Sequence, residues 1–295
     1  MRILITGGCG FVGSNLAIYL KKNLSNSKIF SLDNLYRNGS QINKKRLKIF
    51  KIINYKINIQ DYKKISKLPK FDLIIDCCAE PAIEISDKDP DRIINTNLIG
   101  TFNILKKCQR DKSKIIFLST SRVYSIDALR KLIKQKDLIN KVNIKFEVNE
   151  KFQTNLPKSL YGFSKLSSED LIKEYNYSNK IKYIINRFGV IAGPWQFGKQ
   201  DQGFVPLWVA KHFLKSKLAY IGFGGNGAPQ NPSTTDFTES WNGTNWTAVG
   251  TLNTGRNGIG QAGTSTTALA AGGEGGAGLT EEWNAGDLIT TVTTT

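Results

Sequence analysis

The N-terminal end constrains the fold of this chain more than any other segment. Arg2–Thr6 is a β-branched, largely apolar run, glycines follow at three-residue intervals, and a helix-like segment covers Ser14–Asn23. Gly7 permits a tight turn, Gly10 lets the backbone approach a pyrophosphate, and Gly13 lets helix and strand pack closely. This order of strand, glycine turn and helix predicts a dinucleotide-binding α/β domain. A glycine-rich loop without a ligand is the alternative interpretation.

An acidic residue at the expected spacing supports the dinucleotide interpretation. Asp33 lies 20 residues after Gly13 and directly follows the second strand-like run, Ile29–Leu32. A carboxylate there can accept hydrogen bonds from the ribose hydroxyls. Because it also repels a 2′-phosphate, Asp33 favours NAD over NADP. Arg37 lies nearby and keeps NADP as an alternative cofactor.

The rest of the first 225 residues alternates apolar runs with helical patterns. This pattern is typical of a doubly wound parallel sheet covered by helices on both faces. The further predicted strands are Ile52–Ile57, Leu73–Cys77, Lys114–Leu118 and Tyr183–Asn186, and the further helices are Pro90–Gln109 and Lys165–Tyr175. A charged, weakly periodic stretch from Ile126 to Asn155 predicts a mostly helical insertion.

A second motif carries acid–base chemistry. Tyr161 and Lys165 are four residues apart at a predicted helix start, so they share one face of the helix. The ammonium and a cationic nicotinamide should lower the pKa of the phenol, so that Tyr161 acts as a general base. Thr120 follows a buried strand and can hydrogen-bond the same substrate oxygen. An ordinary surface pair of Tyr and Lys is the alternative.

The charge and the cysteines exclude several other classes. The formal net charge is +17, but residues 226–295 hold one basic residue and six acidic ones, and no nucleic-acid-binding motif accompanies the Lys-rich part. The four cysteines have no CxxC spacing, which favours buried apolar residues over a metal site. No signal peptide or membrane span is predicted, so we expect a reduced, cytoplasmic protein without nucleic-acid or membrane partners.

Several segments together resemble one family. TGGCGFVGS at 6–14, SLDN at 31–34, INTNLIGT at 94–101, STSRVY at 119–124 and YGFSK at 161–165 resemble the extended short-chain dehydrogenase/reductases, the nucleotide-sugar epimerases and dehydratases. The stretches 186–203 and 220–225 most resemble the CDP-paratose 2-epimerases (CDP-tyvelose epimerases), as does Ala79-Glu80-Pro81. The resemblance runs from Met1 to about Gly225.

The resemblance implies a role for each matched position. It places the pyrophosphate on Gly7, Gly10, Phe11, Val12 and Gly13, the adenosine ribose on Asp33 and Asn34, and adenine on Asn58 and Ile59. Asn58 stands where family members usually have Asp. Cys78, Ala79 and Asn97 would lie beside the cofactor, and Thr120, Tyr161 and Lys165 would form the catalytic set, with Tyr161 and Lys165 also contacting NAD. Gln196, Lys199 and Gln202, together with Thr120, are candidate substrate contacts.

The implied reaction is a redox-neutral epimerisation with NAD as cofactor and a nucleotide sugar, most specifically a CDP-hexose, as substrate. Tyr161 would take a proton from a sugar hydroxyl while the hydride of the same carbon passes to NAD. The keto sugar would then present its other face and be reduced again. The resemblance also implies a homodimer that pairs through helices such as those predicted at Pro90–Gln109 and Lys165–Tyr175.

The amino-acid composition of the chain changes near Gly224. Thr238–Gly243 is echoed by Thr280–Ala285, 42 residues later, in a segment rich in Gly, Thr and Trp. This pattern indicates short strands of a β-rich repeat and resembles the kelch-like repeats of phage structural proteins. We therefore predict an NAD-binding domain at 1–225 with a truncated substrate domain and a repeat-like tail at 226–295. A structural or binding protein, or a non-functional fusion, is the alternative to an active epimerase.

Overall fold

The computed structural model describes most of the first 213 residues and short segments beyond them. The described residues are 1–81, 88–131, 148–198, 203–213, 221–223, 238–241, 246–248, 252–254, 260–263, 267–271, 280–284 and 289–292. The chain divides into two compact units, Met1–Pro206 and Leu207–Thr295. Among the described residues, no helix is both long and apolar enough to cross a bilayer.

A six-stranded parallel sheet forms the centre of the first unit. Its strands are β1 (Arg2–Thr6), β2 (Lys28–Leu32), β3 (Ile53–Tyr55), β4 (Leu73–Asp76), β5 (Lys114–Thr120) and β6 (Tyr183–Phe188). They lie in the order β3-β2-β1-β4-β5-β6, and every neighbouring pair is parallel. The chain moves outward from β1 in one direction and then in the other, which is the doubly wound topology. The predicted fold class is confirmed.

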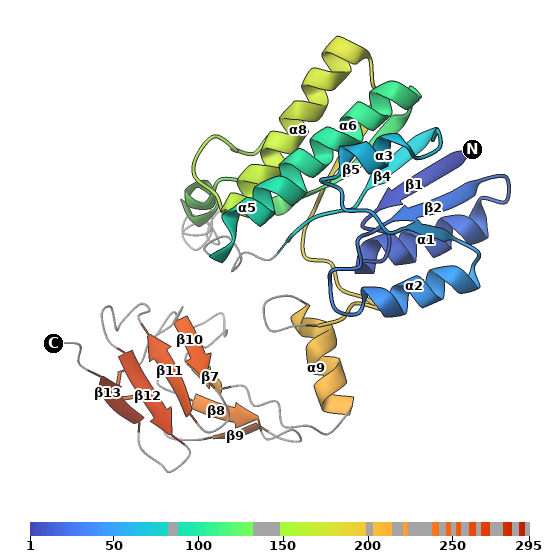
Figure 1. Ribbon diagram of the computed structural model, residues 1–295. Coiled ribbons are helices and arrows are strands. Elements are labelled where there is room, and N and C mark those ends of the chain that lie inside the picture. The colour runs from blue at the N-terminus through green and yellow to red at the C-terminus, as the bar shows by residue number, and fades with distance from the viewer. Residues whose placement is uncertain are drawn as a thin grey trace, which may run out of the picture. The chain divides into compact units, whose positions relative to one another are not determined.

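Helices cover both faces of this sheet, as Figure 1 shows. They are α1 (Phe11–Asn23), α2 (Ser40–Ile49), α3 (Tyr62–Ser66), α5 (Pro90–Ile93), α6 (Gly100–Asp111) and α8 (Leu160–Asn179), with a π-helical turn η1 (Ile94–Ile99) and a 3-10 turn η2 (Ser121–Val123). The predicted helix at 90–109 is thus divided into α5, η1 and α6. The predicted insertion at 126–155 falls partly outside the described residues.

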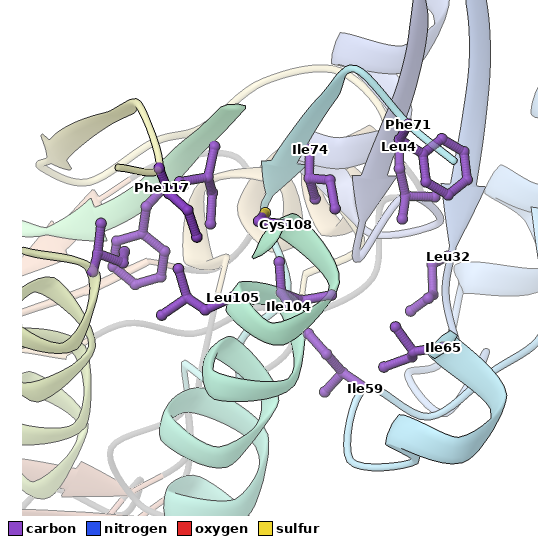
Figure 2. Close-up of a cluster of buried hydrophobic side chains, with 13 residues drawn as sticks. Leu4, Leu32, Ile59, Ile65, Phe71, Ile74, Ile104, Leu105, Cys108 and Phe117 are labelled. Carbon is purple, nitrogen blue, oxygen red and sulfur yellow. The ribbon is translucent and has the colours of Figure 1, made fainter. Parts of the chain in front are cut away.

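Alternation along the strands builds two separate cores. On one face Leu4, Ile74 and Phe117 pack with residues of α3, α6 and α8, the cluster shown in Figure 2. On the other face Ile3, Ile5 and their neighbours pack against α1 and α2. Successive side chains of a strand point to opposite faces, so a parallel sheet buried on both sides needs apolar residues at nearly every position. This is why the predicted strands read as continuous apolar runs.

The second unit contains short antiparallel strands. β7 (Ile221–Phe223), β8 (Thr238–Trp241) and β9 (Trp246–Ala248) form one sheet, and β10 (Gly260–Gly263), β11 (Thr267–Ala271), β12 (Thr280–Asn284) and β13 (Ile289–Val292) form another. Both copies of the sequence repeat begin strands, β8 and β12. Helix α9 (Phe204–Phe213) spans the division between the units. The predicted boundary near 225 stays a prediction, and 224–227 lie outside the described residues.

Candidate cofactor and active site

A cleft of about 1050 Å³ lies at the carboxyl ends of the parallel strands. It is lined by the turns after β1 and β2 and by the segments after β4 and β5. In the order β3-β2-β1-β4-β5-β6, the strand that follows β1 in the sequence lies on one side of it, and the strand that follows β4 lies on the opposite side. The loops after β1 and β4 therefore diverge. Such a switch point is where open α/β sheets bind ligands.

The glycine turn has the shape that a pyrophosphate requires. Gly7 has a φ of 59°, and a Cβ there would lie 3.0 Å from backbone atoms of Cys77 and Cys78. A Cβ on Gly13 would lie 2.3 Å from the Gly7 carbonyl oxygen, so only glycine lets α1 start this close to β1. Gly10 caps α1 without a side-chain acceptor, and Gly10, Phe11 and Val12 line the cleft. The first turn of α1 is therefore open to an anionic ligand.

Asp33 is held in a fixed orientation beside this turn. Its Oδ2 accepts a hydrogen bond from the Cys9 backbone N–H at 3.0 Å, and its Oδ1 accepts one from Leu35 N–H at 2.7 Å. Burial raises the pKa of the carboxyl above its ordinary value, and these two hydrogen bonds oppose the rise in part. Asp33 lines the cleft one strand away from the glycine turn, where the two hydroxyls of a ribose could reach it.

The predicted adenosine contacts lie further along the same wall. Asn34, Asn58 and Ile59 all line the cleft. Asn34 Oδ1 accepts from Tyr36 N–H at 3.0 Å, and Asn58 Oδ1 accepts from Gln60 N–H at 3.1 Å, so each oxygen already closes a local turn. Their predicted roles as ribose and adenine contacts stay predictions.

Thr120 and Tyr161 come together at the other end of the cleft. Thr120 is the last residue of β5, Tyr161 lies in the first turn of α8, and both line the cleft. Burial raises the pKa of the Tyr161 phenol above its ordinary value, while the hydrogen bond from Thr120 and the charge of Arg122 lower it less. Lys165 is not among the groups that shift the pKa of this phenol in the chain by itself, so its predicted lowering influence stays a prediction. The part assigned to a bound nicotinamide stays a prediction.

Lys165 is not among the residues that line the cleft. Its side chain is 1% exposed, and its ammonium lies 3.9 Å from the centroid of the Phe117 ring. Burial lowers the pKa of Lys165 below its ordinary value, and the negative charge of Asp76 is the largest influence that opposes the fall. The structure therefore brings Thr120 and Tyr161 together in the cleft and buries Lys165 outside the cleft lining.

The segment after β4 reaches the cleft through Cys78 and Ala79, and their place beside the cofactor stays a prediction. Asn97 differs, because its side chain is fully buried and it is not among the lining residues. Its amide oxygen accepts from Glu80 N–H at 2.8 Å, and its Nδ2 donates to the Glu80 carbonyl at 3.2 Å and to Ser164 Oγ at 3.0 Å. Asn97 thus fastens the segment after β4 to α8 instead of facing the cleft.

Glu80 is a cleft residue to which the sequence analysis assigned no role. Its side chain is 4% exposed, and one carboxylate oxygen pairs with Arg92. The other carboxylate oxygen has no hydrogen-bond partner in the described part of the chain. Arg92 also donates to the Tyr36 hydroxyl at 3.0 Å, and Glu80, Arg92 and Tyr36 all line the cleft. An acidic side chain four residues after the end of a buried parallel strand was the sequence signal that could have found it.

Of the predicted substrate contacts, Gln196 lies in the described residues, whereas Lys199 and Gln202 lie outside them. Gln196 is half-buried and lines the cleft, and its buried Oε1 has no hydrogen-bond partner within the described ranges. Asn15 Nδ2 donates to the Pro194 carbonyl at 2.9 Å, and the Arg46 guanidinium lies 4.0 Å from the centroid of the Trp195 ring. These contacts with α1 and α2 hold the loop that carries Gln196 over the cleft.

Fold and cleft together define a domain of the doubly wound α/β class with a cleft at its switch point. Comparison with known families narrows this class: residues 3–231 match the model of the NAD dependent epimerase/dehydratase family, so the chain belongs to that family. NAD is the cofactor on which this family depends.

Individual relatives act on different nucleotide sugars. The chain is 35% identical over 232 residues to a dTDP-D-glucose 4,6-dehydratase of Dictyostelium discoideum, covering 76% of this chain and 51% of that protein. It is 25% identical over 230 residues to UDP-glucuronate 4-epimerase 4 of Arabidopsis thaliana, covering 75% of this chain and 48% of that protein. The chain thus spans about half the length of these curated relatives.

Solved structures agree on the fold. A UDP-glucose 4-epimerase of Thermotoga maritima, solved with UDP-glucose, matches with a TM-score of 0.61 and 26% identity over 74% of this chain and 65% of that one. A UDP-glucuronic acid 4-epimerase of Bacillus cereus, solved with NAD, matches with a TM-score of 0.58 and 26% identity over 74% and 65% of the two chains.

Proposed function

We propose that the chain binds NAD along the glycine turn and epimerises a nucleotide sugar at the Thr120 end of the cleft. One observation carries this proposal: a turn open to a pyrophosphate lines the same cleft as Thr120 and Tyr161, whose hydroxyls could bind one substrate oxygen. Gly7, Gly10 and Gly13 have the geometry that a dinucleotide needs, so the residues present fit the cofactor. Asp33 would accept hydrogen bonds from the adenosine ribose.

In the reaction Tyr161 would take the proton of a sugar hydroxyl and later return it, with Thr120 holding the same oxygen in place. Bound NAD would supply the hydride chemistry, accepting the hydride and giving it back. The protein contributes orientation: α8 presents Tyr161 towards the end of β5, and Asn97 ties α8 to the segment after β4. Lys165 would hold positive charge beneath the phenol.

For the substrate we propose a CDP-hexose, because the loop 186–203 resembles that of the CDP-paratose 2-epimerases. Gln196 supports a polar ligand at this place, since its buried Oε1 has no hydrogen-bond partner among the residues that the structure describes. Because the relatives are named for dTDP- and UDP-sugars, these nucleotide sugars are the substrates to compare with the CDP-hexose. We further propose a cytoplasmic homodimer that pairs through α6 and α8, which pack side by side.

A dehydratase is the second candidate, favoured by the 35% identity to dTDP-D-glucose 4,6-dehydratase. Elimination of water needs a further acid or base beside the Tyr. Neither of the two residues that follow Thr120, Ser121 and Arg122, carries a carboxylate that could serve as this acid or base. The sequence also leaves a structural or binding protein with a kelch-like tail, or an inactive fusion, as the alternative. For the epimerase we expect weak turnover, because the family match ends at residue 231.

The first test is the cofactor content of the purified, intact chain. We expect NAD in near-stoichiometric amounts in the supernatant after denaturation, and we expect the Tyr161→Phe variant, which keeps the glycine turn and Asp33, to retain NAD as well. Incubation of the wild type with CDP-paratose, UDP-glucuronate and dTDP-glucose should give at most slow isomerisation of the CDP-sugar, which Tyr161→Phe abolishes. A product lighter by one water would favour the dehydratase. Absence of NAD, together with no binding of added NAD to a folded protein, would overturn the proposal.

A further inference from the structure

We propose that Arg92 is a second phosphate-binding group of the cleft, which closes over the pyrophosphate of the bound dinucleotide opposite the glycine turn. This inference rests on the proposed function, because it concerns how the chain holds NAD. Arg92 lies in α5, lines the cleft, and has no role in the sequence analysis above. It would be a binding residue for the cofactor and not a catalytic one.

The Arg92 guanidinium joins two walls of the cleft. It pairs with the carboxylate of Glu80, a residue that follows β4, and it donates at 3.0 Å to the hydroxyl of Tyr36, a residue that follows β2. It also lies 4.2 Å from the centroid of the Tyr36 ring. Strand β1 lies between β2 and β4 in the sheet, and the glycine turn follows β1. A pyrophosphate on that turn would therefore lie beneath the bridge from Tyr36 to Glu80.

Both ends of this bridge are fixed. The Glu80 backbone N–H donates to the Asn97 side-chain oxygen at 2.8 Å, and the Glu80 carbonyl accepts from Asn97 Nδ2 at 3.2 Å. The Tyr36 backbone N–H donates to Asn34 Oδ1 at 3.0 Å, which ties Tyr36 to a predicted ribose contact. The orientation of the Arg92 guanidinium is thus set before a ligand binds, and this lowers the entropic cost of binding.

The charge around the glycine turn favours a cation at this place. A dinucleotide pyrophosphate carries a negative charge on each phosphate, whereas the first turn of a helix supplies only about half a positive charge. The first turn of α1 contains no Lys or Arg. The carboxylates Asp33, Asp89 and Asp91 line the same cleft, so without a cation this part of it would repel a pyrophosphate. Arg92 lies in the same helix as Asp91 and offsets that charge.

Glu80 orients Arg92 without occupying all of its donors. A guanidinium has five N–H groups in a planar fork that matches the oxygens of a phosphate. One nitrogen of Arg92 bonds to Glu80 and another bonds to Tyr36, while the remaining N–H groups have no acceptor among the residues that the structure describes. The Arg92 side chain is 25% exposed and that of Glu80 is 5% exposed. The guanidinium, and not the carboxylate, is therefore the accessible member of the pair.

The test compares ADP, which carries an adenosine and a pyrophosphate as NAD does, with adenosine, which has no phosphate. Both are titrated by calorimetry into the full chain after charcoal treatment has removed bound nucleotide. We expect Arg92→Gln to bind ADP about 10- to 100-fold more weakly than the wild type and adenosine equally well. Arg130→Gln is the matched control, because Arg130 also pairs with a carboxylate but does not line the cleft. Equal ADP affinities of Arg92→Gln and the wild type would overturn the proposal.

A second variant separates phosphate binding from stability. Arg92→Gln by itself leaves the buried Glu80 carboxylate without its cation, which destabilises a fold. Glu80→Gln combined with Arg92→Gln leaves no member of the pair charged. We expect this double variant to melt closer to the wild type and to bind ADP as weakly as Arg92→Gln does. ADP binding restored to the wild-type affinity in the double variant would contradict a direct role of Arg92.

CDP distinguishes the phosphates of the cofactor from those of a nucleotide-sugar substrate. Titrated into the NAD-loaded chain, CDP should bind equally well to the wild type and to Arg92→Gln. A loss of affinity for CDP without a loss for ADP would assign Arg92 to the substrate and overturn this inference. A folded wild type that binds neither ADP nor NAD would overturn the proposed function as well. A wild type that binds both, with ADP binding unaffected in Arg92→Gln, would overturn this inference alone.

Discussion

At the scale of single residues, burial sets the protonation of the groups that face the cleft. Asp33 and Tyr161 both have a raised pKa because the charged form of each is desolvated, and the hydrogen bonds from Cys9, Leu35 and Thr120 oppose this only in part. The spacing of Asp33 from the glycines predicted its place at the end of β2. Its burial could not be predicted, because residues distant in the sequence supply it.

Asp33 should make NAD binding depend on pH. The carboxylate, not the protonated acid, accepts from two ribose hydroxyls, so NAD affinity should rise as pH rises through the raised pKa of Asp33. The free energy of unfolding should change with pH in the opposite direction. Folded Asp33 holds its proton more tightly than the unfolded chain does, so its contribution to stability falls as the pH rises from 3.8 to the raised pKa. Calorimetric NAD titrations at several acidic pH values measure the first effect.

Asp33→Asn should bind NAD about 10- to 100-fold more weakly at neutral pH and lose the acidic dependence. Asp170→Asn, at an exposed position on α8, is the control and should behave as wild type. If Asp33→Asn retained the same pH dependence, another group would control NAD binding.

At the scale of elements, close approach and buried ion pairs hold the helices on the sheet. The start of α1 rests on the glycine turn, where Gly13 meets the Gly7 carbonyl. Helix α8 joins β5 and β6 through Glu169, which binds Ser119 and Arg187. Strong apolar runs predicted all six strands, whereas α2 and α3 were not predicted. The α2 sequence SQINKKRLKI is mostly polar, and its helix depends on packing against α1 and β3.

Gly13→Ala should destabilise the first unit. The added Cβ would lie 2.3 Å from backbone oxygen, so α1 must move away from β1, at a cost of about 1–3 kcal/mol that exceeds the gain in helix propensity. Gly189→Ala is the matched control, because a Cβ there meets nothing within 4 Å, and it should change stability by less than about 0.5 kcal/mol. Urea unfolding followed by circular dichroism compares them. Equal free energies of unfolding for the two variants would show that the glycine turn accommodates the added Cβ without loss of stability.

Glu169→Gln should weaken the attachment of α8 to the sheet. Glu169 is 1% exposed, and its replacement leaves the Arg187 guanidinium without its anion, which costs about 3–5 kcal/mol. The exposed pair of Lys173 and Asp170 on the same helix provides the comparison, since Asp170→Asn should cost about 0–1 kcal/mol. A thermal-melt series measures both, and similar losses for the two variants would contradict this role of Glu169.

At the scale of the whole molecule, the chain consists of two units of different architecture. The first, Met1–Pro206, contains the parallel sheet and α1 to α8, and the second, Leu207–Thr295, contains the antiparallel strands. Strand β7 lies before the change of composition at Gly224, yet it pairs with β8 beyond it. The glycine turn, Asp33, Thr120 and Tyr161 all belong to the first unit.

NAD should therefore stabilise the first unit without stabilising the second. At about 100 times its Kd the ligand adds about 2.7 kcal/mol to the unit that binds it. Helical circular dichroism reports mainly on the first unit. Tryptophan fluorescence reports mainly on the second, which holds four of the five Trp residues. On addition of NAD we expect the first melting curve to shift upward and the second to stay. Equal shifts of both curves would mean that the units unfold together.

The sequence by itself determined the class of fold and the identity of the cofactor turn, because both depend on local patterns. Apolar runs, a glycine triplet and an acid at fixed spacing recur wherever a βαβ unit holds a dinucleotide. Only the tertiary structure decided which side chains share a space. It buried Lys165 against the Phe117 ring, directed Asn97 towards Glu80, and left one buried oxygen of Glu80 without a hydrogen-bond partner among the described residues. Burial and charge pairing arise between distant segments, and no pattern within one segment records them.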